Sequence, residues 1–287
     1  QLVISKTSVA QIDANIARLQ KLKHDAEALF KNGFAEKLDV DRTEVQLANL
    51  LTQKRNTDNL ISNGYLGLKM LIGMPMADTL VLTDTVTDES LKEGLLNEGI
   101  YQYTDRNDYQ YLQFVRKLND YNVRRYKLTK IPSVSLSSGY SKLAQRNEFS
   151  FLGKGDWFSS SYVGLNINIP IFKGFATNAN IKTAQLQLQQ TQNQIDNLKI
   201  AIDNEVNTAE NNYHNAVASI DAQLRNVKLA EEVYNQTQKK YQAGLGTTTD
   251  ISNAQADLIE AQQNYTAALY DAAIAKIDYL KAIGKLP

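Results

Sequence analysis

Residues 176–243 read ATNANIKTAQLQLQQTQNQIDNLKIAIDNEVNTAENNYHNAVASIDAQLRNVKLAEEVYNQTQKKYQA and contain neither Pro nor Gly. Apolar residues recur along this stretch at seven-residue spacing, in two successive series. The series are Ile181, Leu188, Ile195, Ile202, Ala209 and Ala216, and then Val206, Tyr213, Ile220, Val227, Tyr234 and Tyr241. This spacing keeps one apolar stripe on one side of a helix that supercoils with its neighbours. The stretch therefore predicts one helix, about 100 Å long, in a coiled coil or bundle of similar length.

The chain then breaks at residues 243–250, AGLGTTTD. The two glycines are typical of a helix C-terminus followed by a tight turn, and the Thr and Asp residues are typical of the start of the next helix. We predict a second helix over residues 251–283, ending before Gly284. A short turn between two long helices makes them antiparallel neighbours.

The same hairpin occurs a second time in the sequence. Residues 30–33 and 38–40 match residues 241–244 and 249–251 at a constant offset of 211 (241 minus 30), and the same offset pairs Gly73 with Gly284. A turn, a helix and its terminating glycine thus repeat together, which indicates an internal duplication. We divide the chain into the end of a first repeat (1–73), a connector (74–104) and a second repeat (105–287). Because the first copy begins close to its turn, we expect the natural protein to start upstream of Gln1.

The second repeat contains two candidate strands within residues 132–171. In each strand, apolar residues alternate with small or polar ones, as in residues 134–140 and 163–169. Strands of roughly ten residues can cross an outer membrane as part of a β-barrel, and Phe149, Phe151, Trp157 and Phe158 between them suit an aromatic girdle. A soluble hairpin packed on helices would show the same alternation. The long coiled-coil context favours the membrane interpretation, which requires further strands from elsewhere.

Composition excludes several classes of protein. Lys plus Arg and Asp plus Glu number 31 each, so the basic excess typical of nucleic-acid binding is absent. Cys is absent and the two histidines, His24 and His214, are far apart in sequence, so no cysteine or histidine metal site is indicated. No nucleophile–base pair or phosphate-binding glycine loop is present. We expect no catalytic residues, no metal and no cofactor.

Several motifs, in order, resemble those of the TolC-like outer-membrane efflux family. Residues 104–109, TDRNDY, resemble the segment that opens the family's helix before the strands, and residues 131–134, IPSV, resemble its entry to the strand. Residues 169–174, IPIFKG, resemble its strand-to-helix junction, and residues 240–251 resemble its Arg-Tyr-x-x-Gly…Asp-Val turn. The ordered set covers nearly the whole chain.

This resemblance implies a fold that is mainly α with a β-hairpin. Long antiparallel coiled-coil helices would form an α-barrel subunit, the two strands would belong to a trimeric β-barrel, and the whole would be internally duplicated. The implied function is a passive exit duct, not an enzyme, in the outer membrane and periplasm of a Gram-negative bacterium. Its implied partners are two further copies of the chain, a periplasmic adaptor protein, an inner-membrane pump and outer-membrane lipid, but no nucleic acid.

The resemblance also implies two kinds of site at the periplasmic hairpin tips. Adaptor docking falls on the turns, with glycines for close backbone approach and apolar anchors beside them. A pore gate falls on acidic residues after each turn and on a tyrosine before the second. The docking candidates are Gly33, Phe34, Gly244 and Leu245, and the gate candidates are Asp39, Asp250 and Tyr241.

Two alternatives stay open at this point. An Asp at a helix start caps free amides and suits the helix dipole, which explains Asp39 and Asp250 without any gate. Gly246 stands where relatives place an arginine, so the charged part of a gate network is in doubt. A soluble coiled-coil scaffold or adhesion protein with no transport role would explain the heptads, but neither the repeated tips nor the amphipathic strands.

Overall fold

The structure is a computed structural model of residues 1–287, and it describes all of them except 85, 93–100, 146–155 and 287. The chain divides into two compact units. The first unit comprises residues 1–102 and 203–287, and the second comprises residues 103–202. Helix α5, Ala176–Gln242, contributes residues to both units.

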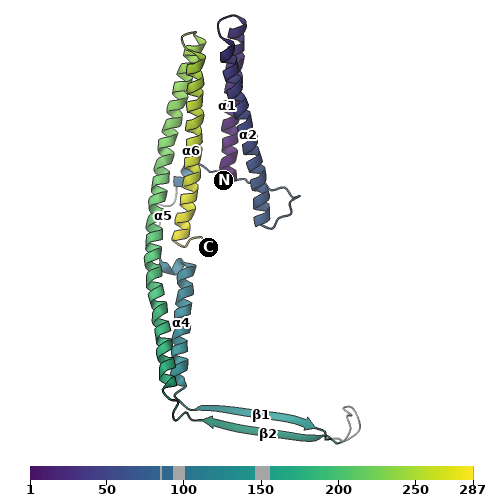
Figure 1. Ribbon diagram of the computed structural model, residues 1–287, viewed down its shortest axis with the longest axis vertical. Coiled ribbons are helices and arrows are strands. Elements are labelled where there is room, and N and C mark those ends of the chain that lie inside the picture. The colour runs from purple at the N-terminus through teal and green to yellow at the C-terminus, as the bar shows by residue number, and fades with distance from the viewer. Residues whose placement is uncertain (85, 93–100, 146–155, 287) are drawn as a thin grey trace. The chain divides into compact units, whose positions relative to one another are not determined.

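The first unit is built from two helical hairpins (Figure 1). Helix α1, Leu2–Lys31, pairs with α2, Lys37–Leu71, and the second half of α5 pairs with α6, Thr248–Ala282. A short helix α3, Asp88–Lys92, lies in the connector. The predicted helix over 251–283 thus begins three residues earlier than expected, because Thr247 and not Asp250 occupies the N-cap position.

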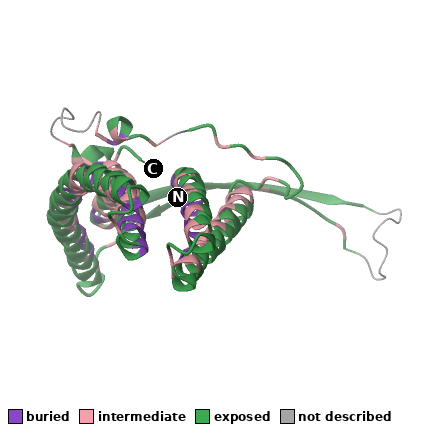
Figure 2. Ribbon diagram, turned by 90° about the horizontal axis from the view of Figure 1, so that it is seen from above, coloured by how far each residue is buried: buried purple, intermediate pink, exposed green. Residues whose placement is uncertain are grey.

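The core of the first unit lies between the helices. One cluster joins Leu19 and Leu22 of α1, Tyr234 and Tyr241 of α5 and Leu258 of α6. Figure 2 shows that buried residues form stripes along the helices, while much of the helical surface is exposed. Most members of the predicted seven-residue series in α5 are buried, including Ile195, Ile202 and Ile220 at 1%, 1% and 0% exposure. The apolar stripe read from the sequence is therefore the packed face of the helix.

Within the first unit, the connector is held in place by side chains of α5 and α6. The Tyr213 hydroxyl donates to the Leu91 carbonyl at 2.5 Å, and the Tyr265 hydroxyl donates to Asp88 Oδ1 at 2.5 Å. Burial, together with the Asp88 carboxylate, raises the pKa of Tyr265. Tyr213 and Tyr265 therefore combine a ring packed against apolar neighbours with a satisfied hydroxyl.

The second unit contains a short 3₁₀ turn, Tyr103–Asp105, helix α4, Asn107–Leu128, the strands β1, Ser133–Leu143, and β2, Phe158–Asn168, and the first part of α5. The strands are antiparallel, and their register places Val134 opposite Ile167 and Leu136 opposite Leu165. The predicted alternation thus gives one apolar face. Nearly every residue of both strands is exposed. Of the predicted aromatic girdle, Trp157 and Phe158 are exposed, whereas Phe149 and Phe151 lie outside the described residues.

Among the helices that the structure describes, none is long and apolar enough to cross a membrane.

Candidate functional site at the helical tips

The first tip is a glycine-closed turn after α1. Gly33 has φ +79°, which only glycine adopts without strain. Its amide donates to the Phe30 carbonyl at 3.0 Å, and the amide of Phe34 donates to the Leu29 carbonyl at 2.9 Å. These two bonds satisfy carbonyls at the end of the helix that would otherwise lack donors.

The second tip repeats this geometry. Gly244 has φ +73°, its amide donates to the Tyr241 carbonyl at 3.0 Å, and the amide of Leu245 donates to the Lys240 carbonyl at 2.9 Å. The residue after each glycine is a large apolar side chain held in solvent, since Phe34 and Leu245 are both 81% exposed. The two tips therefore present matching apolar groups on rigid turns.

Both aspartates that the sequence offers as gate candidates are built into helix N-termini. Asp39 Oδ2 accepts the amide of Glu36 at 3.3 Å, and Asp250 Oδ2 accepts the amide and the hydroxyl of Thr247 at 3.0 and 2.7 Å. Each helix starts with a capping box. The backbone amide of Thr247, followed by its hydroxyl, lowers the pKa of Asp250, so that carboxylate is ionised at neutral pH. The capping interpretation of these residues is thus confirmed.

A hollow of about 810 Å³ lies between the two tips. Four of the seven predicted site residues line it: Phe34, Asp39, Tyr241 and Gly244. Gly33, Leu245 and Asp250 do not. The Tyr241 ring is 7% exposed and its buried hydroxyl has no hydrogen-bond partner within the described chain. Tyr241 and Asp39 therefore share one hollow without a direct bond between them.

Gly246 has a steric reason to lack a side chain. A Cβ placed on it would lie 3.1 Å from the backbone nitrogen of Tyr241 and 3.4 Å from the carbonyl carbon of Lys240. A cation does lie near the tips, but it belongs to Arg42, which the sequence did not indicate. Arg42 Nη1 donates to Thr249 Oγ1 at 2.6 Å and so links the second turn of α2 to the first turn of α6. No sequence spacing relates these residues, because their contact depends on the packing of two hairpins.

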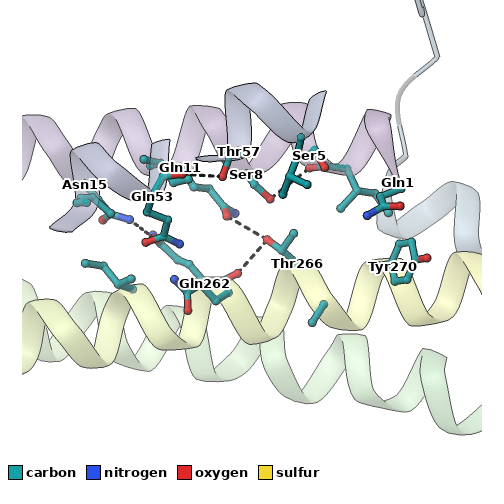
Figure 3. A pocket seen from close by; sticks show the side chains of 17 residues that line it. Gln1, Ser5, Ser8, Gln11, Asn15, Gln53, Thr57, Gln262, Thr266 and Tyr270 are labelled. Atoms are coloured by element: carbon teal, nitrogen blue, oxygen red, sulfur yellow. Dashed lines mark hydrogen bonds between the residues drawn. The ribbon is translucent and has the colours of Figure 1, made fainter. Parts of the chain in front are cut away.

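A buried polar seam lies farther along the same pair of hairpins (Figure 3). Asn15 Nδ2 donates to Gln262 Oε1 at 2.7 Å, and Asn15 Oδ1 accepts from Gln255 Nε2 at 3.2 Å and from Arg18 Nη2 at 2.6 Å. Beside it, Thr266 Oγ1 donates to Gln11 Oε1 at 3.1 Å. The seam borders a hollow of about 350 Å³. Polar groups thus fix the register between α1 and α6, which sequence analysis had not predicted.

The fold is that of outer-membrane channel subunits. A crystal structure of CusC, whose description refers to transmembrane channel formation, matches 99% of this chain with a TM-score of 0.82 at 18% identity, over 65% of that chain. The outer membrane protein VceC from Vibrio cholerae matches 99% of this chain with a TM-score of 0.74 at 17% identity, over 67% of that chain. Identities this low establish a common fold.

Sequence comparison shows the family as well as the fold. Residues 112–285 match the family model of outer membrane efflux proteins, and this chain belongs to that family. It is 20% identical to the outer membrane protein TolC of Vibrio cholerae over 259 residues, which are 90% of this chain and 59% of that protein. It is 25% identical to TolC of Escherichia coli over 270 residues, 90% of this chain and 54% of that protein. Protein CyaE of Bordetella pertussis is 32% identical over 163 residues, 56% of this chain and 33% of that protein.

The predicted resemblance, the mainly helical fold class with one strand pair, and the location in the outer membrane and periplasm of a Gram-negative bacterium are confirmed by this membership. The family consists of transport proteins, not known enzymes. In the described part of the chain, no group of three or more His, Cys, Asp or Glu side chains could hold a metal ion. The chain spans a little over half the length of the TolC relatives that it matches.

Proposed function

We propose that this chain is part of a subunit of an outer-membrane exit duct, the passive outer component of a tripartite export system. Family membership supports this proposal, and it disfavours the soluble scaffold. Three copies would form the tube, and a periplasmic adaptor and an inner-membrane pump would supply substrate and energy. Some relatives carry names that refer to protein secretion, such as the proteases secretion protein PrtF of Dickeya chrysanthemi, 22% identical over 277 residues. The cargo of this chain would be small molecules or proteins.

The observation that best supports this function is the matching geometry of the two tips. Each combines a glycine-closed turn with an apolar side chain that is four-fifths exposed, Phe34 in one and Leu245 in the other. A large apolar group on a rigid turn loses little conformational freedom when it binds. We therefore assign adaptor docking to Gly33, Phe34, Gly244 and Leu245.

We assign the pore gate to Asp39, Asp250 and Tyr241. The capping role of both aspartates is compatible with gating, because each carboxylate is fixed at a helix terminus beside the tips. Three copies of such a chain would bring three or six carboxylates to one constriction, where they would attract cations. The unpartnered hydroxyl of Tyr241 supports its place in the gate, since a buried hydroxyl favours a state in which it finds an acceptor.

The test is single-channel recording of the full-length protein in planar bilayers. We expect replacement of both Asp39 and Asp250 by Ala to raise the conductance, because the constriction loses fixed charge and its helix caps. Replacement of both by Asn keeps an acceptor for the N-cap amide, so it should lower cation selectivity with a smaller rise in conductance. Replacement of Asp41 and Asp257, exposed carboxylates on the same helices, is the matched control. Unchanged conductance and selectivity in the Ala variant would leave capping as the only role.

A further inference from the structure

The chain has an uneven charge distribution around its strands. Residues 121–145 and 157–195 contain no Asp or Glu, although the whole chain has equal numbers of acidic and basic residues. The two segments contain these cations: Arg124, Arg125, Lys127, Lys130, Lys142, Lys173 and Lys182. Most of them flank the place where α4 leads into β1 and β2 leads into α5. We call this place the junction.

Three lysines of the junction have no acidic partner in the part of the chain that the structure describes. Arg124 forms an ion pair with Asp120 at 2.9 Å, but among the described residues no ion pair is made by Lys127, Lys130 or Lys173. All three are exposed. Their charges are therefore available to an anionic partner.

The junction also holds aromatic rings in solvent at a strained turn. Gly174 has φ +54° and is followed by Phe175 with φ +66°, the one non-glycine residue with positive φ in the described chain. A Phe is disfavoured in this conformation relative to Gly, so the backbone at Phe175 is strained. Phe175 packs edge-on against Phe172 with ring centres 5.9 Å apart. Phe172 and Phe175 are nonetheless 77% and 75% exposed.

These two chemistries meet in one hollow of about 340 Å³. Lys130 and Lys173 line it together with Ile171, Phe172 and Phe175, and Thr129, Thr177 and Asn178 add further polar groups. Cations beside exposed aromatic and aliphatic groups match a molecule with an anionic head and an apolar body. Aromatic residues of this kind gather at the level of lipid headgroups, and clustered Lys and Arg near a membrane attract anionic lipids.

We propose that the junction is a binding surface for an anionic phospholipid of the periplasm-facing leaflet, with the phosphate at Lys130 and Lys173 and the acyl chains against Phe172 and Phe175. The inference rests on the proposed function, which puts the strands in the outer membrane and the helices in the periplasm. The boundary between strand and helix then lies at the headgroups of that leaflet. Both charge and apolar contact at the junction would then fix how deeply the strands sit in the membrane.

The test is lysine acetylation of the full-length protein, followed by peptide mass spectrometry. The protein is compared in detergent alone, with inorganic phosphate, and in nanodiscs of phosphatidylethanolamine with or without phosphatidylglycerol. We expect Lys127, Lys130 and Lys173 to be protected only when phosphatidylglycerol is present, while the exposed Lys117 and Lys228 react equally in all samples. Equal protection in detergent alone would mean that the junction is covered without any anionic lipid, and would overturn the proposal. Equal protection by phosphatidylethanolamine or by inorganic phosphate would also overturn it.

A triple variant tests the same surface by affinity. Lys127→Gln with Lys130→Gln and Lys173→Gln should reduce the preference for phosphatidylglycerol over phosphatidylethanolamine by about fivefold per lysine. Arg55→Gln with Lys117→Gln and Lys228→Gln removes equal charge elsewhere and should leave the preference unchanged. An unchanged preference in the junction variant would contradict the proposal. Single-channel recording of the wild-type protein separates the two hypotheses. If channels form but the protein shows no preference for phosphatidylglycerol, only the lipid site is contradicted. If no channels form in any bilayer, the exit-duct function itself is contradicted.

Discussion

At the scale of single residues, the tips depend on two backbone conformations. Gly33 and Gly244 end their helices with φ +79° and +73°, and each places an exposed apolar residue directly after the turn. No heavy atom lies within 4 Å of where a Cβ would be on either glycine. The requirement for glycine is therefore one of backbone strain and not of space.

Replacement of Gly33 or Gly244 by Ala should destabilise the corresponding tip by about 1–2 kcal/mol, the cost of a left-handed conformation for a residue with a Cβ. Amide hydrogen exchange at the turn measures the effect. Gly67→Ala is the control: Gly67 lies inside α2 and also has open space, so alanine should stabilise that helix by about 0.5–1 kcal/mol. Slower exchange at the tips of the glycine variants would contradict this account.

At the scale of elements, polar contacts decide how α1 meets α6. Asn15 is 2% exposed and Gln255 is 1% exposed, and their amides form the seam with Gln262 and Arg18. Burial of polar groups is costly unless they are hydrogen-bonded, so a seam of this kind favours one register over its neighbours. The apolar clusters on either side also hold the helices together, but apolar contacts discriminate less between one register and the next.

Replacement of Asn15 by Ala should lower the free energy of unfolding by about 1–3 kcal/mol or more, because the side chains of Gln255, Gln262 and Arg18 lose partners in a buried site. Chemical denaturation followed by circular dichroism measures the change. Asn56→Ala, at an exposed position of α2, should be neutral or slightly stabilising. A triple variant with Asn15→Leu, Gln255→Leu and Gln262→Leu removes the buried amides together and leaves none of them unpaired, so it should cost less than Asn15→Ala. Equal destabilisation by the two variants would show that unpaired polar groups are not the cause.

At the scale of the whole molecule, the proposed function depends on three exposed surfaces of this chain. The strand pair is exposed on both faces, the tips expose Phe34 and Leu245, and the junction exposes lysines and aromatic rings. Each surface has a distinct chemistry, and in the proposals above each would bind a distinct partner: further strands in a membrane, an adaptor, and lipid headgroups.

Replacement of both Phe34 and Leu245 by Ser should weaken binding of the cognate periplasmic adaptor to the full-length protein by about tenfold or more, since loss of an anchoring side chain commonly costs over 1 kcal/mol. Surface plasmon resonance measures the affinity. Both residues are mostly solvent-exposed, so the helical content should stay unchanged. Met70→Ser, 76% exposed near the other end of α2, is the matched control. Equal affinity of the double variant and the wild type would remove the tips from the docking surface.

The sequence by itself determined the local structure of this protein. The seven-residue spacing in residues 176–243 predicted α5 and its buried face, and the offset of 211 predicted that the two turns share one geometry. Strand alternation over residues 134–140 and 163–169 predicted two strands, each apolar on one side, but not the register that pairs them. These features follow from periodicity and from glycine's backbone freedom, which are properties of short stretches of chain.

The tertiary structure decided which side chains meet. The contact of Arg42 with Thr249, the seam around Asn15 and the common hollow of Asp39 and Tyr241 join residues more than 200 positions apart. No local pattern encodes such contacts, because they depend on how two hairpins pack. The aspartates were evident from the sequence as residues of helix starts, but only the structure showed each one accepting the amide at its N-cap, with its helix start beside the tip that carries the proposed docking residues.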